Sequence, residues 1–176
     1  FSGTKTSMYV DGSDNTLRLE SSTLWDDIVG NIDDWAGNID TGNGSNIVST
    51  GSYQFVDPAT GLEYFDLGAV YTSRVTTNVD SLVYDTATLW DNLYPTISID
   101  DWPGLIDGDS LSGTEYNIQI STTTDDPSAA PTWNSYQAFS LGDFSFRACR
   151  NKLVVTNTVT SNNIKFSDLG ITIDHP

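Results

Sequence analysis

The sequence predicts an all-β chain, a jelly-roll-like β-sandwich preceded by a small hairpin and linker segment. The first observation is compositional: the 176 residues include 21 aspartates but only 3 glutamates, together with 42 serines and threonines. Aspartate and serine favour turns and caps, whereas glutamate is a helix former. The second observation is that short stretches of alternating polar and apolar residues recur at roughly 8–12-residue spacing, which is typical of a sandwich.

The first expected element is a β-hairpin near the N-terminus. Tyr9 and Val10 precede the turn-forming run Asp11–Asn15, and Thr16–Glu20 then alternates polar and apolar residues. Residues 40–51 are rich in Gly, Asn and Ser, as a linker is. We therefore divide the chain into a Trp/Asp-rich strand and linker segment, residues 1–50, and a β-sandwich domain, residues 51–176.

An internal duplication is the strongest repeat signal. Thr23–Asp27 (Thr-Leu-Trp-Asp-Asp) recurs as Thr88–Asn92, and Ile32–Trp35 (Ile-Asp-Asp-Trp) recurs as Ile99–Trp102. Two copies are too few for a solenoid. They indicate either matching edges of two related sandwiches or two copies of a loop-and-strand unit in one assembly.

The strands expected after the linker follow from period-two alternation and turn residues. Residues 51–56 alternate, 57–61 form a turn, and 62–68 lead into a strand over 69–77. Residues 122–131 form a Thr/Asp/Pro loop. Three further strands are expected. In the first, Tyr116, Ile118 and Ile120 share one face. In the second, one face carries Phe144, Phe146 and Ala148, and the other carries Arg147, Cys149, Leu153 and Val155; the third carries Phe166, Leu169, Ile171 and Ile173.

The charge of the chain excludes several classes of partner. A formal net charge of −17, with only 7 lysines and arginines, leaves no basic stripe for nucleic acid beyond the group Arg147, Arg150 and Lys152. The sequence contains no run of about 18 apolar residues, so it does not predict a transmembrane helix. Cys149 and His175 are the only residues of their kinds, so zinc sites built from several Cys or His ligands are excluded.

Calcium is the metal that the acidic turns could hold. Oxygen ligands close together in sequence, with glycine to permit tight turns, suit Ca²⁺. The candidates are Asp11 and Asp14 with Asn15, and Asp40 with Asn43. Neither matches an EF-hand loop. The alternative is that these side chains only hydrogen-bond their own backbone in Asx turns.

Aromatic side chains beside polar acceptors are candidate sugar platforms, because the apolar faces of sugars stack on flat rings. Trp35 and Trp102 each follow an Asp-Asp pair, and Trp133 and Tyr136 flank a loop. The alternative for each tryptophan is packing in a core or against a neighbouring protomer. We expect no catalytic residues, because adjacent aspartates on a strand point to opposite faces and cannot form a dyad. We expect Arg147 to pair with an acid such as Asp143 or Asp174.

Several segments in order resemble a known family. Phe65–Tyr71 (Phe-Asp-Leu-Gly-Ala-Val-Tyr) looks like a strand of galactose-binding-like, discoidin-type jelly rolls. Together with residues 116–127, 131–136, 142–148 and 169–176, it resembles the C-terminal β-sandwich region of the J-like, tail-tip host-specificity proteins of tailed bacteriophages. Asn151 and His175 depart from that pattern, which has apolar residues at these positions, and Asn151 would cost stability if it faced the core unpaired.

The resemblance implies a virion tail component, outside the cell, that forms a homotrimer with other copies of itself, contacts other tail proteins and contributes to host-surface recognition. On this basis we expect a non-enzymatic, structural and adhesive module of a tail tip or fibre that contacts a host-surface glycan or receptor. The alternative is a carbohydrate-binding module of a secreted marine glycoside-active enzyme.

Overall fold

The part of the chain that the structure describes is all-β, as predicted. A computed structural model describes residues 1–20, 47–85, 113–159 and 162–175, and no helix in these residues is long and apolar enough to cross a membrane. The strands are β1 (Thr4–Thr6), β2 (Met8–Asp11), β3 (Thr16–Leu19), β4 (Thr50–Gln54), β5 (Phe65–Asp85), β6 (Thr114–Thr123), β7 (Gln137–Phe139), β8 (Leu141–Asn157) and β9 (Asn162–Asp174).

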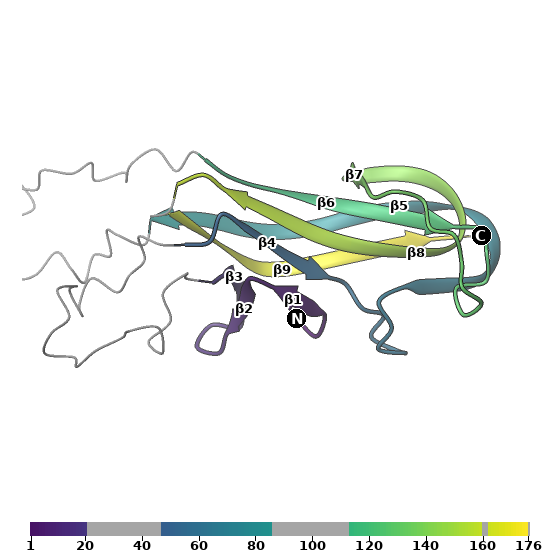
Figure 1. The fold of residues 1–176 in the computed structure, drawn as a ribbon, viewed down its shortest axis with the longest axis horizontal. Helices are drawn as coiled ribbons and strands as arrows, with labels where there is room; N and C mark the ends of the chain where they lie inside the picture. Colours follow the sequence, from purple (N-terminus) through teal and green to yellow (C-terminus); the bar gives the residue numbers. More distant parts are fainter. Residues whose placement is uncertain (21–46, 86–112, 160–161, 176) are drawn as a thin grey trace, which may run out of the picture.

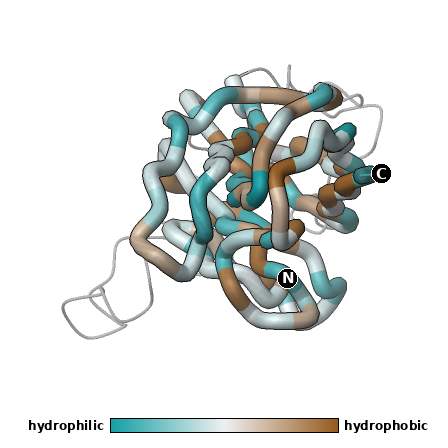
Figure 2. The backbone as a smooth tube through the Cα atoms, turned by 90° about the vertical axis from the view of Figure 1, so that its right-hand side faces the viewer, coloured by the Kyte–Doolittle hydropathy of each residue, from teal (hydrophilic) through white to brown (hydrophobic). Residues whose placement is uncertain are grey.

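The described strands form one antiparallel sheet in the order β1-β4-β8-β5-β9-β3-β2, with β6 pairing to β8 and β7 pairing to β6. The sheet is nearly closed, consistent with a jelly-roll-like β-sandwich. The long strands β5, β8 and β9 run along the long axis of the molecule (Figure 1). Figure 2 views the same sheet along that axis, with hydrophobic and hydrophilic positions interspersed along the strands.

The predicted hairpin is confirmed. Strand β2 pairs with β3, from Met8 opposite Leu19 to Asp11 opposite Thr16. Asn15 closes the turn with a positive φ of 55°, a conformation that asparagine tolerates better than most residues. The alternation of polar and apolar residues over Thr16–Leu19 therefore places Leu17 and Leu19 in the core, where neither has exposed surface.

The N-terminal strands belong to the same sheet as the rest of the described chain. Strand β1 pairs with β4, and β3 pairs with β9. Met8, Leu17 and Leu19 share one buried cluster with Leu153 and Phe166, which lie in β8 and β9. Hydrophobic burial therefore joins the first 20 residues to the predicted sandwich domain. The predicted boundary at residue 50 depends on residues 21–46, which lie outside the described residues.

The described residues that flank the two segments with the duplicated Trp/Asp motifs lie at the same end of the sheet. Glu20 and Val48, from the two sides of the first segment, meet there, because the backbone N–H of Val48 donates to the carbonyl of Glu20. At this end the cross-strand pairs are Thr50–Thr156, Thr114–Asn157 and Asp85–Asn162. The duplicated motifs themselves lie outside the described residues.

The core has two buried clusters. The larger one lies between β2, β3, β4, β6, β8 and β9, and the smaller one contains Val75, Ile120, Phe146 and Cys149. Asn151 lies inside this core with no exposed surface, and its Oδ1 has no hydrogen-bond partner among the described residues. We therefore expect Asn151 to lower the stability of the fold, because an unpaired buried acceptor loses the hydrogen bonds that it makes to water in the unfolded chain.

Cys149 should be unreactive in the folded protein. Burial raises the pKa of its thiol to about 12, so at pH 8 the nucleophilic thiolate is scarce and enclosed. We expect Ellman's reagent to label it rapidly in 6 M guanidinium and at least about a hundredfold more slowly in native buffer, as the rarity of unfolding requires. Because the folded pKa lies above the unfolded value of about 8.5, its contribution to stability is complete below pH 8.5 and is lost as pH rises toward 12.

The control is Cys149→Ala, which should abolish labelling and flatten the alkaline part of the stability curve, measured as the urea midpoint from pH 8 to 11. Rapid labelling of the native wild-type protein would contradict the buried position of this side chain.

Candidate functional site

The loop between β6 and β7 is fastened to β6 by side-chain and backbone hydrogen bonds. The backbone N–H and Nδ2 of Asn134 donate to the carbonyl and hydroxyl oxygens of Thr122, at 2.9 and 3.0 Å. Ser121 Oγ donates to the Asn134 carbonyl at 2.6 Å, and the Thr132 N–H donates to Asp125 Oδ2 at 2.9 Å. This loop carries Trp133 and Tyr136, so the two rings are held in place before any ligand arrives.

Two cations of β8 lie against these rings. The Arg150 guanidinium carbon is 4.7 Å from the ring centroid of Trp133 and 5.0 Å from that of Tyr136. Lys152 Nζ is 4.2 Å from the Tyr136 centroid. These distances fall within the range of cation–π attraction. We call Trp133, Tyr136, Arg150 and Lys152 the aromatic–cationic cluster.

Hydrogen bonds from neighbouring strands orient the cluster. Tyr136 Oη donates to Gln54 Oε1 at 3.2 Å, and Gln54 Nε2 donates to the Asn151 carbonyl at 2.9 Å. Arg150 Nε donates to Ser121 Oγ at 3.2 Å. Burial raises the pKa of the Tyr136 phenol despite the opposing charge of Arg150, so this group is a neutral hydrogen-bond donor at pH 7.

The two cations of the cluster lack the carboxylate partners that most other basic residues have. Arg150 and Lys152 have no carboxylate oxygen within 4.0 Å among the described residues, although the chain carries a net charge of −17. Both are half-buried, as are the two rings. Basic residues that do pair with a carboxylate are Arg18, Arg74, Arg147 and Lys165. The cluster therefore offers flat apolar surface beside positive charge, which suits binding rather than acid–base chemistry.

Of the predicted ligand-binding residues, the structure brings Trp133 and Tyr136 together, while Trp35 and Trp102 lie outside the described residues. Sequence reasoning missed that Arg150 and Lys152 belong to the same site. A signal was present, because positions i and i+2 of a strand share a face and these two residues flank the inward-facing Asn151. What the sequence did not show is which loop crosses that face.

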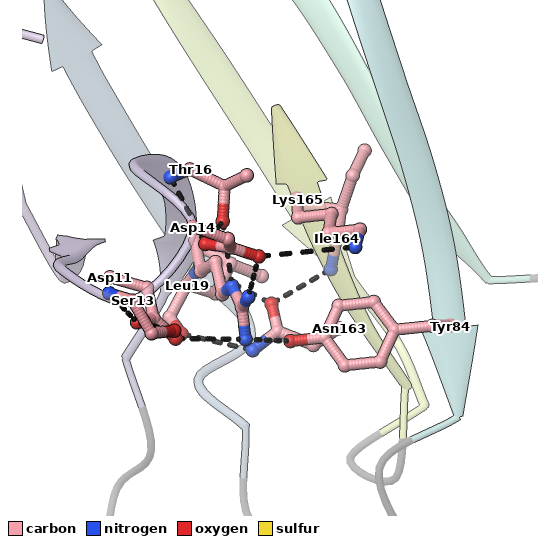
Figure 3. Close-up of polar contacts among 10 residues, drawn as sticks. Asp11, Ser13, Asp14, Thr16, Leu19, Tyr84, Asn163, Ile164 and Lys165 are labelled. Atoms are coloured by element: carbon pink, nitrogen blue, oxygen red, sulfur yellow. Dashed lines mark hydrogen bonds and ion pairs between the residues drawn. The ribbon is translucent and has the colours of Figure 1, made fainter. Parts of the chain in front are cut away.

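The carboxylates of Asp11 and Asp14 are engaged within the hairpin turn (Figure 3). Asp11 Oδ1 accepts from the backbone N–H and hydroxyl of Ser13, at 2.9 and 2.6 Å, and Asp14 Oδ1 accepts from those of Thr16, at 3.2 and 2.7 Å. Arg18 pairs with Asp14 and lies 3.1 Å from Asp11 Oδ2. These hydrogen bonds, followed by the charge of Arg18, lower the pKa of both carboxyls. The geometry supports the Asx-turn interpretation of this pair.

The other calcium candidates, Asp40 and Asn43, lie outside the described residues. Within the part of the chain that the structure describes, no group of three or more His, Cys, Asp or Glu side chains could hold a metal ion. Calcium binding by this chain therefore stays a prediction.

The predicted partners of Arg147 are wrong. Arg147 pairs with Asp66 and Asp126, at 3.3 and 2.9 Å, whereas Asp143 pairs with Arg74 at 2.8 Å. The reason lies in the register: Arg74 stands directly opposite Asp143 across the β5–β8 ladder. Residues directly opposite each other on neighbouring strands are the closest neighbours, so Asp143 pairs with Arg74, and Arg147 pairs with Asp66 of β5 and Asp126 of the β6–β7 loop instead.

The described residues also form an open groove of about 600 Å³. It lies between β5, β6 and β7, and the lining residues with polar side chains are Thr77, Tyr116, Asn117 and Ser140. Its apolar lining includes Val79, Ile118 and Phe139. No carboxylate or histidine is among the residues that line it.

Fold and surface together define an all-β domain with a preorganised aromatic and cationic contact surface. Comparisons with protein-family models, with curated proteins and with solved structures found no match to this chain. Its functional interpretation therefore depends on the geometry of the described residues and on the resemblance in sequence stated above.

Proposed function

We propose that the chain is a non-enzymatic, structural and adhesive module that attaches to a surface glycan. Following the resemblance in sequence, we place it in the tail tip or fibre of a tailed bacteriophage, as a homotrimer that contacts other tail proteins and takes part in host recognition. The observation that carries the adhesive role is the fastening of Trp133 and Tyr136, beside polar and cationic groups, onto a rigid sheet.

The physical support is the chemistry of sugar recognition. Sugars present apolar faces that pack on aromatic rings, and hydroxyl groups that pair with polar side chains. Trp133 and Tyr136 supply the rings, and Arg150, Lys152 and Gln54 supply donors and acceptors around them. A site held on strands and a hydrogen-bonded loop loses little conformational entropy when it binds.

The alternative is a carbohydrate-binding module of a secreted glycoside-active enzyme, which the same contact surface would suit. The two proposals differ in assembly. We expect light scattering of the purified chain to give three times 19.2 kDa, with and without Ca²⁺, if it is a tail module. A monomer that still binds glycans would favour the carbohydrate-binding module.

Adhesion is tested by the effect of Trp133→Ala on glycan binding. On a glycan array, we expect wild-type protein to bind and Trp133→Ala to bind at least about tenfold more weakly, because loss of a stacking ring removes more than about 1.4 kcal/mol of contact. The matched control is Tyr9→Ala, an aromatic residue that is 38% exposed on β2. Retention of full binding by Trp133→Ala would overturn the assignment of this surface.

A further inference from the structure

We propose that the aromatic–cationic cluster selects acidic sugars, meaning glycan residues that carry a carboxylate or a sulfate group. This inference rests on the proposed adhesive function and names the ligand class of the same site. It starts from the charge distribution: in a chain with 24 acidic and 7 basic residues, two adjacent cations face outward with no carboxylate within 4.0 Å among the described residues.

The absence of a partner is notable because acids are close at hand elsewhere. Arg74 and Arg147 lie on the same sheet, and each is paired with an aspartate that its cross-strand or loop neighbours supply. At the cluster the cross-strand neighbours are neutral: Ser121 lies opposite Arg150, and Gln54 and Gln119 lie opposite Lys152. Glu63 acts electrostatically on Tyr136, but its carboxylate is more than 4.0 Å from both cations. The positive charge is therefore left available to an anion from outside the chain.

The geometry suits an anionic sugar better than a free anion. Arg150 is packed between the rings of Trp133 and Tyr136, so an anion that reaches the guanidinium also reaches aromatic surface. Arginine binds planar carboxylate and sulfate oxygens through its fork of N–H groups, while lysine adds a point charge. Their α-carbons, two residues apart on a strand, are separated by roughly 7 Å. A ligand with both an apolar face and a negative group uses all four side chains.

The net charge sets the conditions for the test. A chain of −17 repels acidic polymers at long range, and this repulsion is screened beyond about 8 Å at 0.15 M salt. Contacts at the cluster are shorter than that. Binding is therefore measured at 0.15 M and 0.5 M NaCl, where the local contacts decide the affinity.

The experiment is calorimetric titration of the full chain with oligogalacturonate, with the same oligomer fully methyl-esterified, and with a heparin-derived sulfated oligosaccharide. We expect the acid form to bind at least about tenfold more tightly than its ester, since one charge-assisted contact is worth that much. We expect the double variant Arg150→Gln/Lys152→Gln to lose at least about tenfold in affinity for the acid form. The carboxylated and sulfated arms show which anionic group is preferred.

Arg74→Gln is the control, because it removes a positive charge from the same sheet but outside the cluster, and it should change affinity less than twofold. Circular dichroism verifies folding of each variant, and the comparison of acid with ester on the wild-type protein needs no variant. Equal affinity for the acid and its ester would overturn the inference and leave the adhesive function standing. Failure of all three oligosaccharides to bind, together with no binding on the glycan array, would overturn both.

Discussion

Phe146→Ala should lower the free energy of unfolding by about 3–5 kcal/mol, the usual cost of removing a buried phenylalanine. Phe146 has no exposed surface and packs in the smaller core cluster with Val75, Ile120 and Cys149. These residues come from β5, β6 and β8, so the cavity would lie where three strands meet. We expect a lower urea midpoint with little change in slope, measured by far-UV circular dichroism.

Two variants calibrate this result. Phe146→Leu keeps most of the apolar contact and should cost clearly less than the alanine variant, because the residual cavity is smaller. Val70→Ala, at a side chain that is 52% exposed on β5, should change stability by less than about 0.5 kcal/mol. Similar losses for Phe146→Ala and Val70→Ala would show that Phe146 does not sit in a packed core.

The fold class and the local elements were predictable because they depend on short-range patterns. The hairpin at residues 8–19 needed only alternation and a turn of Asp, Gly, Ser and Asn, and each of these signals lies within a few residues. The turn at 57–61 was likewise predictable, since the Gly61 N–H donates to the Asp57 carbonyl across it. Such features depend on residues that are close in sequence, so they can be predicted without knowing the order of the strands in the sheet.

The long strands show where that reasoning ends. Alternation places Phe146 and Cys149 on opposite faces of β8, yet both are buried in one cluster. The partner strand β5 breaks register between Asp66 and Tyr71, where Gly68 has a φ of 79°. A bulge of this kind increases twist and bends the strand, so both faces of β8 contribute to the interior at that point.

A second bulge shifts β9 in the same way. The ladder passes from Asp80 opposite Asp168 to Ser81 opposite Phe166, so Ser167 is left without a partner in the register. Inward positions therefore change from even to odd numbers, and Phe166 and Leu169 both pack on the larger cluster. The sequence pattern predicted that both belong to the apolar face of the last strand. Only the pairing of β9 with β5 locates the residue where the alternation changes.

The sequence indicated a loop flanked by two aromatic residues, but it did not show how these half-buried rings and the cations of β8 are arranged. Tyr136 is oriented by Gln54, which lies 82 residues earlier in the chain. Arg150 reaches Trp133 because the loop folds back over β6, through hydrogen bonds to Thr122. Contacts of this sequence separation depend on strand order, which composition and spacing do not determine.

Asn163→Ala should lower the free energy of unfolding by about 3 kcal/mol or more, although asparagine is a polar side chain. Asn163 is 2% exposed and substitutes for a missing stretch of ladder between β3 and β9. Its Oδ1 accepts from the backbone N–H of Leu19 at 3.2 Å, and its Nδ2 donates to the carbonyl of Leu19 at 3.1 Å. Alanine would leave both backbone groups buried and unpaired, each at a cost of about 1–3 kcal/mol.

The isosteric variant Asn163→Asp separates hydrogen bonding from shape. It keeps the acceptor for Leu19 but removes the amide donor, so it should destabilise the protein as well, and more strongly as the pH rises and the buried carboxyl becomes charged. The control is Asn117→Ala, because Asn117 is an exposed asparagine of β6, and its loss should stay within about 0.5 kcal/mol. Urea unfolding of all three variants gives the comparison. If Asn163→Ala behaved like Asn117→Ala, the edge between β3 and β9 would be held by the apolar contacts of Leu17, Leu19 and Phe166 alone, since these are the buried side chains on either side of it.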